Sequence, residues 1–239
     1  MKPEELVADI RSYCKKHADK ANVKKYAKFF TEGFDAYGLS KEAFRSKVSS
    51  LINENQVTMQ QVLRASKQLV KSGKYEETNF ASALLKEFSD QFDEHTLPAI
   101  EQWFQIGIVN WAHCDVLCGH LMPPLFEKKI ISLEDLSAWR TAKNKYQRRA
   151  VPVAMLPLLK TAKSYQRLFS FLEPLMMDSE EKVQQGLGWF LREAWKIKPK
   201  ETETFLLKWK DKSPRIIFQY ATEKMTAAQK KRFRKEKKS

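Results

Sequence analysis

The chain has 239 residues and a formal net charge of +14 at pH 7, so it can bury a sizeable core as one large domain or two small ones. No apolar run approaches the roughly 20 residues that span a bilayer, and the start, Met1–Glu5, lacks the apolar core of a secretory signal. Three cysteines without a disulfide-rich pattern are typical of a reducing compartment. We therefore expect a cytoplasmic protein without a membrane partner, and its charge favours nucleic acid as the partner.

Glycine is scarce, with 7 residues, and Leu, Ala, Lys, Glu and Gln recur at helical spacing, which predicts an almost entirely helical chain. Turn-forming residues predict breaks at Gly38–Ser40, Ser72–Gly73, Pro123–Pro124, Asp178–Ser179 and Pro199. The helices expected between them span residues 4–17, 21–35, 40–53, 58–71, 75–93, 97–107, 111–121, 133–142, 145–161, 165–176, 179–197, 200–208, 213–223 and 226–236.

Helix pairs that recur every 30 to 45 residues indicate an all-α fold, either a degenerate HEAT-like α-solenoid or a globular helical bundle. No internal linker is rich in Gly, Ser or Pro, so we expect residues 1–228 to form a single domain. Residues 229–239 are expected to be a basic tail, because the last ten residues hold seven Lys or Arg against one Glu. Such a tail either keeps the protein soluble or contacts phosphates without sequence preference.

The predicted helix that starts at Trp111 combines an aromatic ring with a carboxylate. Because a helix advances about 100° per residue, Trp111 and Asp115 lie about 40° apart, and Asp115 falls at the rim of an apolar stripe. A carboxylate at such a rim is partly desolvated and its field is poorly screened. Asn110 is expected to cap the helix. The alternative is that Trp111 is core and Asp115 is a solvated surface acid. The stripe consists of Trp111, Cys114, Leu117, Cys118 and Leu121.

The same segment carries four possible metal ligands, His113, Cys114, Cys118 and His120. The two cysteines share one face of the helix, and the two histidines share another that points about 100° or more away. The pairs therefore cannot converge on one ion. We expect no metal, and we interpret Cys114 and Cys118 as small buried hydrophobic residues.

Two adjacent arginines follow in Gln147–Val151. Arg149 shares its helix face with Val153 and Leu156, so its neighbours position it, whereas Arg148 projects about 100° away and is expected to reach solvent. A fixed guanidinium can hold a phosphate or form a structural ion pair, and Asp115 is one candidate for that pair.

The tryptophan of Gly188–Glu193 is expected on a polar helix face. Trp189 lies about 100° or more from the centre of the buried stripe of its helix, and a large aromatic ring there is unfavourable unless something covers it. Either a neighbouring helix pair or a nucleic-acid sugar or base could cover it. The stripe is Val183, Leu187, Phe190, Ala194 and Ile197, and the polar face holds Lys182, Gln185, Glu193 and Lys196.

The segments Asn110–Cys118, Gln147–Val151 and Gly188–Glu193, in this order and spacing, resemble the AlkD-type DNA alkylation repair family, from about residue 20 to about residue 225. The resemblance implies a solenoid of HEAT-like antiparallel helix pairs whose concave basic cleft holds double-stranded DNA. It implies that Trp111 and Asp115 are the family's catalytic Trp-x-x-x-Asp, that Arg149 is its arginine, and that Trp189 lines the lesion site. Tyr26 matches a family tyrosine near the DNA, although an aromatic residue on an amphipathic helix is also typical of a core. The side chains expected to contact DNA are those of Arg148, Arg192, Lys145, Tyr26 and Lys182.

One carboxylate, Asp115, accompanies these residues, whereas cleavage of an ordinary glycosidic bond uses two. One is sufficient when the substrate is already cationic, because a purine alkylated at N3 or N7 leaves as a neutral base. Asp115 would stabilise the cation that develops on deoxyribose and align a water molecule, and Trp111 and Trp189 would flank the sugar. The resemblance implies that this proceeds without a tight pocket for the damaged base, unlike ordinary base flipping.

The sequence thus predicts a monomeric, monofunctional alkylpurine DNA glycosylase that leaves an abasic site and needs no cofactor. In a bacterium it would be associated with the nucleoid. The alternative is a non-catalytic α-solenoid that binds damaged or branched DNA or a protein partner.

Overall fold

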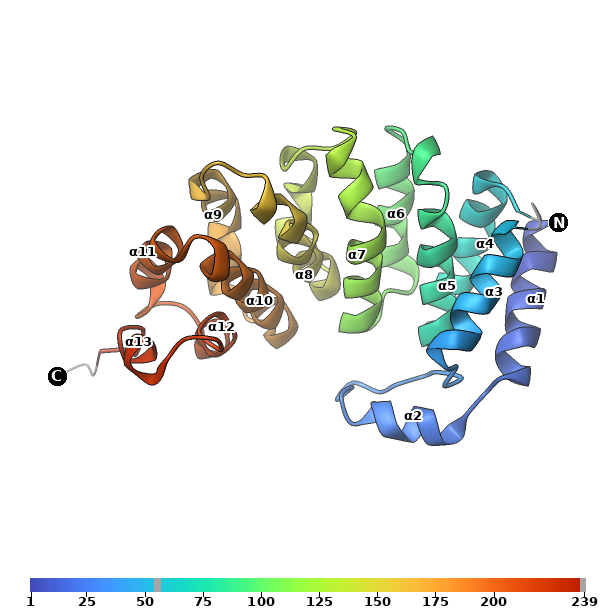
Figure 1. Ribbon diagram of the computed structural model, residues 1–239, viewed down its shortest axis with the longest axis horizontal. Coiled ribbons are helices and arrows are strands. Elements are labelled where there is room, and N and C mark those ends of the chain that lie inside the picture. The colour runs from blue at the N-terminus through green and yellow to red at the C-terminus, as the bar shows by residue number, and fades with distance from the viewer. Residues whose placement is uncertain (54–56, 237–239) are drawn as a thin grey trace. The chain divides into compact units, whose positions relative to one another are not determined.

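The computed structural model describes residues 1–53 and 57–236, and these residues form thirteen α-helices and five short 3₁₀ helices without a strand (Figure 1). The predicted all-α fold is confirmed. The chain divides into two compact units, Met1–Ile131 and Ser132–Ser239, which we call unit 1 and unit 2. The HEAT-like solenoid, its basic cleft and the domain boundary at residue 228 remain predictions. Within the described residues, no helix is both long and apolar enough to cross a membrane.

Unit 1 is built around the contact between two long helices, α4 and α5. Helix α4 also packs on α1 and α6, and α5 also packs on α3 and α7, so nearly all of α5 is buried. Helix α4 buries Val62, Ala65 and Leu69 at helical spacing, as expected for an amphipathic helix. The helices of unit 1 are α1 (Pro3–Lys16), α2 (Lys20–Ala27), α3 (Lys41–Asn53), α4 (Met59–Lys71), α5 (Tyr75–Lys86), α6 (Thr96–Ile106) and α7 (Trp111–Glu127), with a 3₁₀ helix at Ser89–Gln91.

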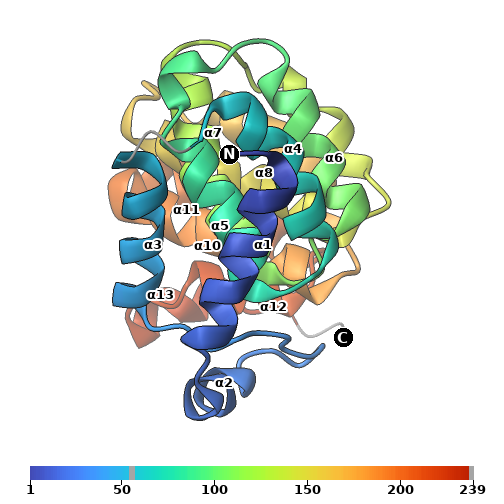
Figure 2. The same cartoon turned by 90° about the vertical axis from the view of Figure 1, so that its right-hand side faces the viewer.

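Helix α2 differs from the other helices of unit 1 because none of its residues is buried. In both views it lies beyond one end of α1 and α3, away from α4 and α5 (Figures 1 and 2). The helix predicted over residues 21–35 ends early, at Ala27. Gly33 has a φ of 98°, a conformation that glycine adopts without strain, and residues 28–40 follow an irregular path to α3.

A buried carboxylate holds this irregular segment. Glu76, in the first turn of α5, accepts hydrogen bonds from all three backbone N–H groups of Tyr37–Leu39, at 2.8, 2.6 and 3.1 Å. The Tyr75 N–H donates to the Asp35 carbonyl at 2.8 Å. Since the segment has no regular secondary structure to pair its backbone, these bonds replace that pairing. They fix residues 35–39 against the start of α5.

Helix α7 continues through Pro123 and Pro124 to Glu127, so the prediction that it ends at residue 121 is wrong. Each proline lacks a backbone donor, but its φ is compatible with a helix. Beyond the prolines the Lys128 N–H donates to the Pro124 carbonyl at 3.1 Å. Burial of Met122 and Leu125 on both sides of the pair stabilises the helix where local propensity does not.

Unit 2 is organised around α10, which packs on α8, α11 and α12. At Gly188 a Cβ atom would lie 2.5 Å from the Tyr220 Cβ, so glycine permits the close approach of α10 to α12. The last residue of α10, Ile197, is 50% exposed, so its predicted burial is wrong, because the packed stripe ends one turn earlier at Ala194. The helices are α8 (Lys145–Ala154), α9 (Gln166–Leu172), α10 (Glu181–Ile197), α11 (Pro199–Trp209), α12 (Arg215–Ala221) and α13 (Ala227–Lys231).

Three predicted helices of unit 2 are replaced by shorter elements. The region 133–142 forms 3₁₀ turns at Glu134–Leu136 and Ala138–Thr141. The regions 145–161 and 165–176 each divide into an α-helix and a 3₁₀ helix, the latter spanning Leu156–Lys160 and Glu173–Met177. In the two divided regions the 3₁₀ helix has a proline in its first turn, where the missing N–H removes the bond that would continue the α-helix.

The beginning of the predicted tail packs on unit 2. Phe233 is 1% exposed, and its carbonyl accepts a hydrogen bond from the Arg215 guanidinium at 2.9 Å. The Glu236 N–H donates to the Asp211 carboxylate at 3.0 Å. The last three residues of the predicted tail, 237–239, lie outside the described part of the chain.

We predict that Glu76→Gln lowers the free energy of unfolding by about 2 kcal/mol, because one amide oxygen replaces two carboxylate oxygens and buried N–H donors lose their acceptor. Urea denaturation measures the change. Glu87→Gln, on an exposed residue at the other end of α5, serves as the control and should change stability by less than about 0.5 kcal/mol. Equal effects of the two substitutions would contradict this role of Glu76.

Candidate nucleic-acid site

Asp115 lies in an aromatic pocket of about 510 Å³ within unit 1. Helices α2, α3, α5 and α7 and the irregular segment 28–40 contribute its walls. The polar lining includes Asp115, Glu76 and Lys41. We call it the Asp115 pocket. Its rings belong to Tyr26, Phe29, Phe30, Phe34, Phe44, Tyr75 and Trp111.

Trp111 is half-buried, and the segment 28–40 holds it in place. Its indole Nε1–H donates to the Phe29 carbonyl at 3.2 Å. Its ring stacks on Phe30 with centroids 5.2 Å apart and an interplanar angle of 19°. Trp111 is therefore not a fully buried core residue, and its orientation is set by a segment about 80 residues earlier in the chain.

Asp115 is half-buried, as its predicted place at the rim of the apolar stripe requires. The start of its helix is fixed by Asn110, whose side-chain oxygen accepts a hydrogen bond from the His113 N–H at 2.9 Å, so the predicted cap is confirmed. The Asn110 amide nitrogen lies 3.3 Å from His113 Nε2. Burial lowers the pKa of His113 to about 4, so this ring is neutral at pH 7 and its Nε2 can accept that bond.

The two cysteines of this helix face inward. Cys114 and Cys118 form no disulfide bond, and their predicted burial is confirmed. Across residues 1–53 and 57–236 we find no cluster of three or more His, Cys, Asp or Glu side chains that could hold a metal ion.

Tyr26 also lines the Asp115 pocket and is 45% exposed, so it is not part of the core. The Lys25 ammonium lies 5.5 Å from the centroid of its ring. Phe29 is 56% exposed, and the Lys28 ammonium lies 5.1 Å from the centroid of its ring. Exposed aromatic rings next to lysines give this end of the pocket both stacking surface and positive charge.

In unit 2, Arg149 is fixed between α8 and α10. Its residue is only 5% exposed, and its Nη1 donates to the Lys182 carbonyl at 2.6 Å. A Cβ atom at Gly186 would lie 3.0 Å from the Arg149 Cγ, so the arginine stem occupies the space that this glycine leaves open. The prediction that its neighbours position Arg149 agrees with this geometry.

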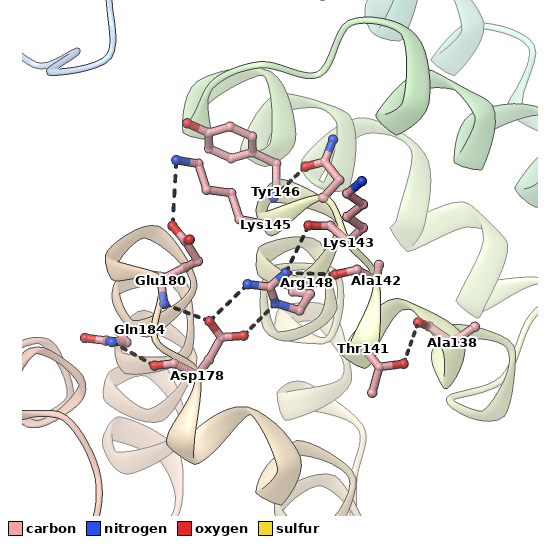
Figure 3. A network of polar contacts seen from close by, with 11 residues as sticks. Ala138, Thr141, Ala142, Lys143, Lys145, Tyr146, Arg148, Asp178, Glu180 and Gln184 are labelled. Atoms are coloured by element: carbon pink, nitrogen blue, oxygen red, sulfur yellow. Dashed lines mark hydrogen bonds and ion pairs between the residues drawn. The ribbon is translucent and has the colours of Figure 1, made fainter.

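Arg148 was predicted to reach solvent, and this prediction is wrong. Its guanidinium forms a two-point ion pair with Asp178, at 2.6 and 3.2 Å, and donates to the carbonyls of Ala142 and Lys143 (Figure 3). The Asp178 carboxylate also accepts from the Glu180 N–H at 2.9 Å. Arg148 therefore ties the start of α8 to the start of α10, a structural role that the local sequence does not reveal.

The other predicted DNA contacts of unit 2 lie on or near α10. The Lys145 ammonium is 3.7 Å from a Glu180 carboxylate oxygen (Figure 3). Arg192 pairs with Glu193 at 3.0 Å and with Glu223. Lys182 is half-buried, and its carbonyl is the acceptor for Arg149.

Trp189 is half-buried on α10. Its indole makes no hydrogen bond or ring contact with the residues that the structure describes. The contact of Trp189 with a ligand stays a prediction.

Two features of the site escaped the sequence analysis. Glu76 shapes the wall of the Asp115 pocket through contacts about 38 residues apart, which no local pattern indicates. Gly186 did leave a signal, because two glycines inside one helix, Gly186 and Gly188, cost about 1 kcal/mol each in helix propensity and usually have a packing reason.

We predict that Gly186→Ala lowers the free energy of unfolding by about 1 to 2 kcal/mol, because the new methyl group crowds the Arg149 Cγ. In an Arg149→Ala background this Cγ is absent, so the same substitution should be neutral or stabilising. A double-mutant cycle by urea denaturation measures the coupling. Gly119→Ala, at a helical glycine with open space around its Cβ position, is the control and should gain up to about 1 kcal/mol. An equal cost of Gly186→Ala in both backgrounds would show that Arg149 is not the group it meets.

Two comparisons with known proteins give a match. Residues 10–225 match the model of a family described as DNA alkylation repair enzyme. Among solved structures, a predicted DNA alkylation repair enzyme from Enterococcus faecalis has a similar fold, with a TM-score of 0.74 and 14% sequence identity over 88% of this chain and 98% of that chain. A search of curated proteins finds no match. The family match extends over most of the chain, so the protein belongs to the DNA alkylation repair enzyme family.

Proposed function

We propose that the protein is a monofunctional DNA glycosylase that hydrolyses the N-glycosidic bond of purines alkylated at N3 or N7. Membership in a DNA alkylation repair family supports DNA as the substrate. The observation that carries the proposal is a half-buried carboxylate, Asp115, in a pocket lined by aromatic rings. Such a site attracts positive charge but offers no second acid for the leaving group, because the other carboxylate of its lining, Glu76, already accepts three backbone N–H groups.

The charge of the lesion removes the need for that acid. Alkylation at N3 or N7 gives the purine a formal positive charge, and breaking the C1′–N bond returns the bonding electron pair to the base, which leaves neutral. The positive charge moves to the deoxyribose. A water molecule then attacks C1′ and loses a proton, which yields an abasic site. Since no lysine nucleophile is needed, the strand stays intact.

Asp115 would supply the larger share of the stabilisation of the cation that develops on the deoxyribose. A unit negative charge 4 Å from a developing cation contributes about 4 kcal/mol at an effective dielectric constant of about 20. An aromatic face contributes about 0.5 to 2 kcal/mol. Trp111, held by its bonds to the segment 28–40, and Trp189 would therefore assist the carboxylate, and neither could replace it.

Arg149 would orient groups around the lesion. Its stem is enclosed by α8 and α10, and its bond to the Lys182 carbonyl fixes the guanidinium plane. A guanidinium that is already ordered loses little rotamer entropy when it binds a phosphate or a carboxylate. We propose that Lys145, Lys182 and Arg192 also contact the DNA backbone. These three residues are less buried than Arg149.

The charge mechanism predicts a sharp substrate preference. Wild-type protein should release N7-methylguanine and N3-methyladenine from duplex DNA and should release uracil and 1,N6-ethenoadenine at least about 100-fold more slowly, a difference of about 3 kcal/mol in activation free energy. Chromatography of the released bases measures each rate against spontaneous loss without protein.

Two results would count against this proposal. Efficient release of uracil would require a second acid. Tight binding of all four duplexes without any release would instead support the non-catalytic DNA-binding alternative.

A further inference from the structure

A second pocket, of about 480 Å³, adjoins the Asp115 pocket in unit 1. The two share Lys41, Phe44 and His120 in their linings. The second pocket lies between α3, the C-terminal end of α5 and α7, and we call it the α3–α5 groove. None of its remaining residues was singled out by the sequence analysis.

The groove presents a row of donors along α3. Lys41, Arg45 and Ser49 recur every four residues, so they lie on one face of that helix, and all three are exposed. From the first to the last they cover about 12 Å of helix, which corresponds to about three nucleotides of one DNA strand at 3.4 Å each.

The charges in this groove are not neutralised. Lys41, Arg45 and Lys86 form no ion pair with the residues that the structure describes, and Glu87 is the one described carboxylate in the lining. Other basic residues of unit 1 do have acidic partners, as Lys47 has in Asp9, at 2.6 Å. Three cations that face one groove repel each other, so an anion there would relieve that repulsion.

His120 closes the groove on the side of the Asp115 pocket. Its ring is half-buried, and Nδ1 has no hydrogen-bond partner among the described residues. Burial and the positive charge of Lys86 both lower the pKa of His120, so the positive field of the groove acts at this ring. A buried ring nitrogen without a partner is costly unless a ligand or water satisfies it.

We propose that the α3–α5 groove binds the backbone phosphates of the DNA strand where that strand leaves the Asp115 pocket. The inference rests on the proposed function, and it assigns the direction in which one strand continues. Arginine, lysine and histidine donors are the usual phosphate contacts in protein–DNA complexes, and such contacts position the duplex without reading its sequence. The groove is selected over other basic surfaces of unit 1 because it is continuous with the pocket that holds Asp115.

The test compares two double variants with the same loss of charge. Arg45→Gln/Lys86→Gln removes two cations of the groove. Arg64→Gln/Lys67→Gln removes an equally exposed arginine and lysine from α4, which line a separate pocket that shares no residue with the Asp115 pocket. The affinity of the full chain for undamaged duplex DNA is measured between 50 and 200 mM salt, a range over which phosphate contacts strongly change affinity.

The groove variant should bind more weakly, and the negative slope of log K against log salt should become shallower by about 0.9 for each lost phosphate contact, or about 1.8 in total. The α4 variant should keep the wild-type slope within about 0.5. With saturating protein, release of N7-methylguanine by the groove variant should stay within about twofold of wild type, because the chemical step is untouched.

Equal slopes in the two variants would overturn the inference, and so would an unchanged slope in the groove variant. The proposed function is judged separately, by base release from the wild-type protein. A wild-type protein that binds duplex DNA without releasing bases would refute the proposed glycosylase activity. The salt slopes of the two variants would then still decide whether the α3–α5 groove binds phosphates. A wild-type protein that does not bind duplex DNA would overturn both.

Discussion

The carboxylate of Glu76 fixes the part of unit 1 on which the candidate site depends. It accepts three backbone N–H groups from residues 37–39 and so anchors a segment that has no helix or strand of its own. That segment supplies Phe29 and Phe30, which orient Trp111 through a hydrogen bond and a ring stack. The environment of Asp115 is therefore set by one buried acid that takes no part in the proposed chemistry.

The two units use different means to hold their functional groups. In unit 1, aromatic packing around Asp115 reduces solvent screening, which strengthens the field of one carboxylate. In unit 2, a missing side chain at Gly186 lets α8 and α10 enclose Arg149. Both arrangements restrict a charged side chain before any ligand binds, and this lowers the ordering cost of binding. Preorganised charge is also the main requirement for a reaction whose leaving group needs no protonation.

Local sequence patterns were sufficient to predict the positions of side chains where the structure follows helical periodicity. The cap at Asn110, the rim position of Asp115 and the burial of Cys114 all follow from the positions of a few residues on one helix. The same periodicity made Ile197 look buried, because it cannot tell that packing ends one turn before the helix does.

The remaining features depend on contacts between residues far apart in the chain. Arg148 was expected in solvent because Asp178, its partner, lies 30 residues away. The path of residues 37–39 depends on Glu76, which lies about 38 residues further along the chain. Helix α7 passes Pro123–Pro124 because burial on both sides outweighs a local signal that ends most helices. Tertiary interactions overrode local propensity in each case.

The central claim is that one carboxylate performs the chemistry while other groups hold the DNA. The most direct test is Asp115→Asn, with the single-turnover release of N7-methylguanine and the affinity for the same duplex measured side by side. We expect the release rate to fall by about 10³-fold, which matches the loss of about 4 kcal/mol of electrostatic stabilisation, and the affinity to stay equal or rise slightly because a negative charge has been removed. A variant that loses affinity and release in parallel, or that keeps the wild-type release rate, would contradict this account.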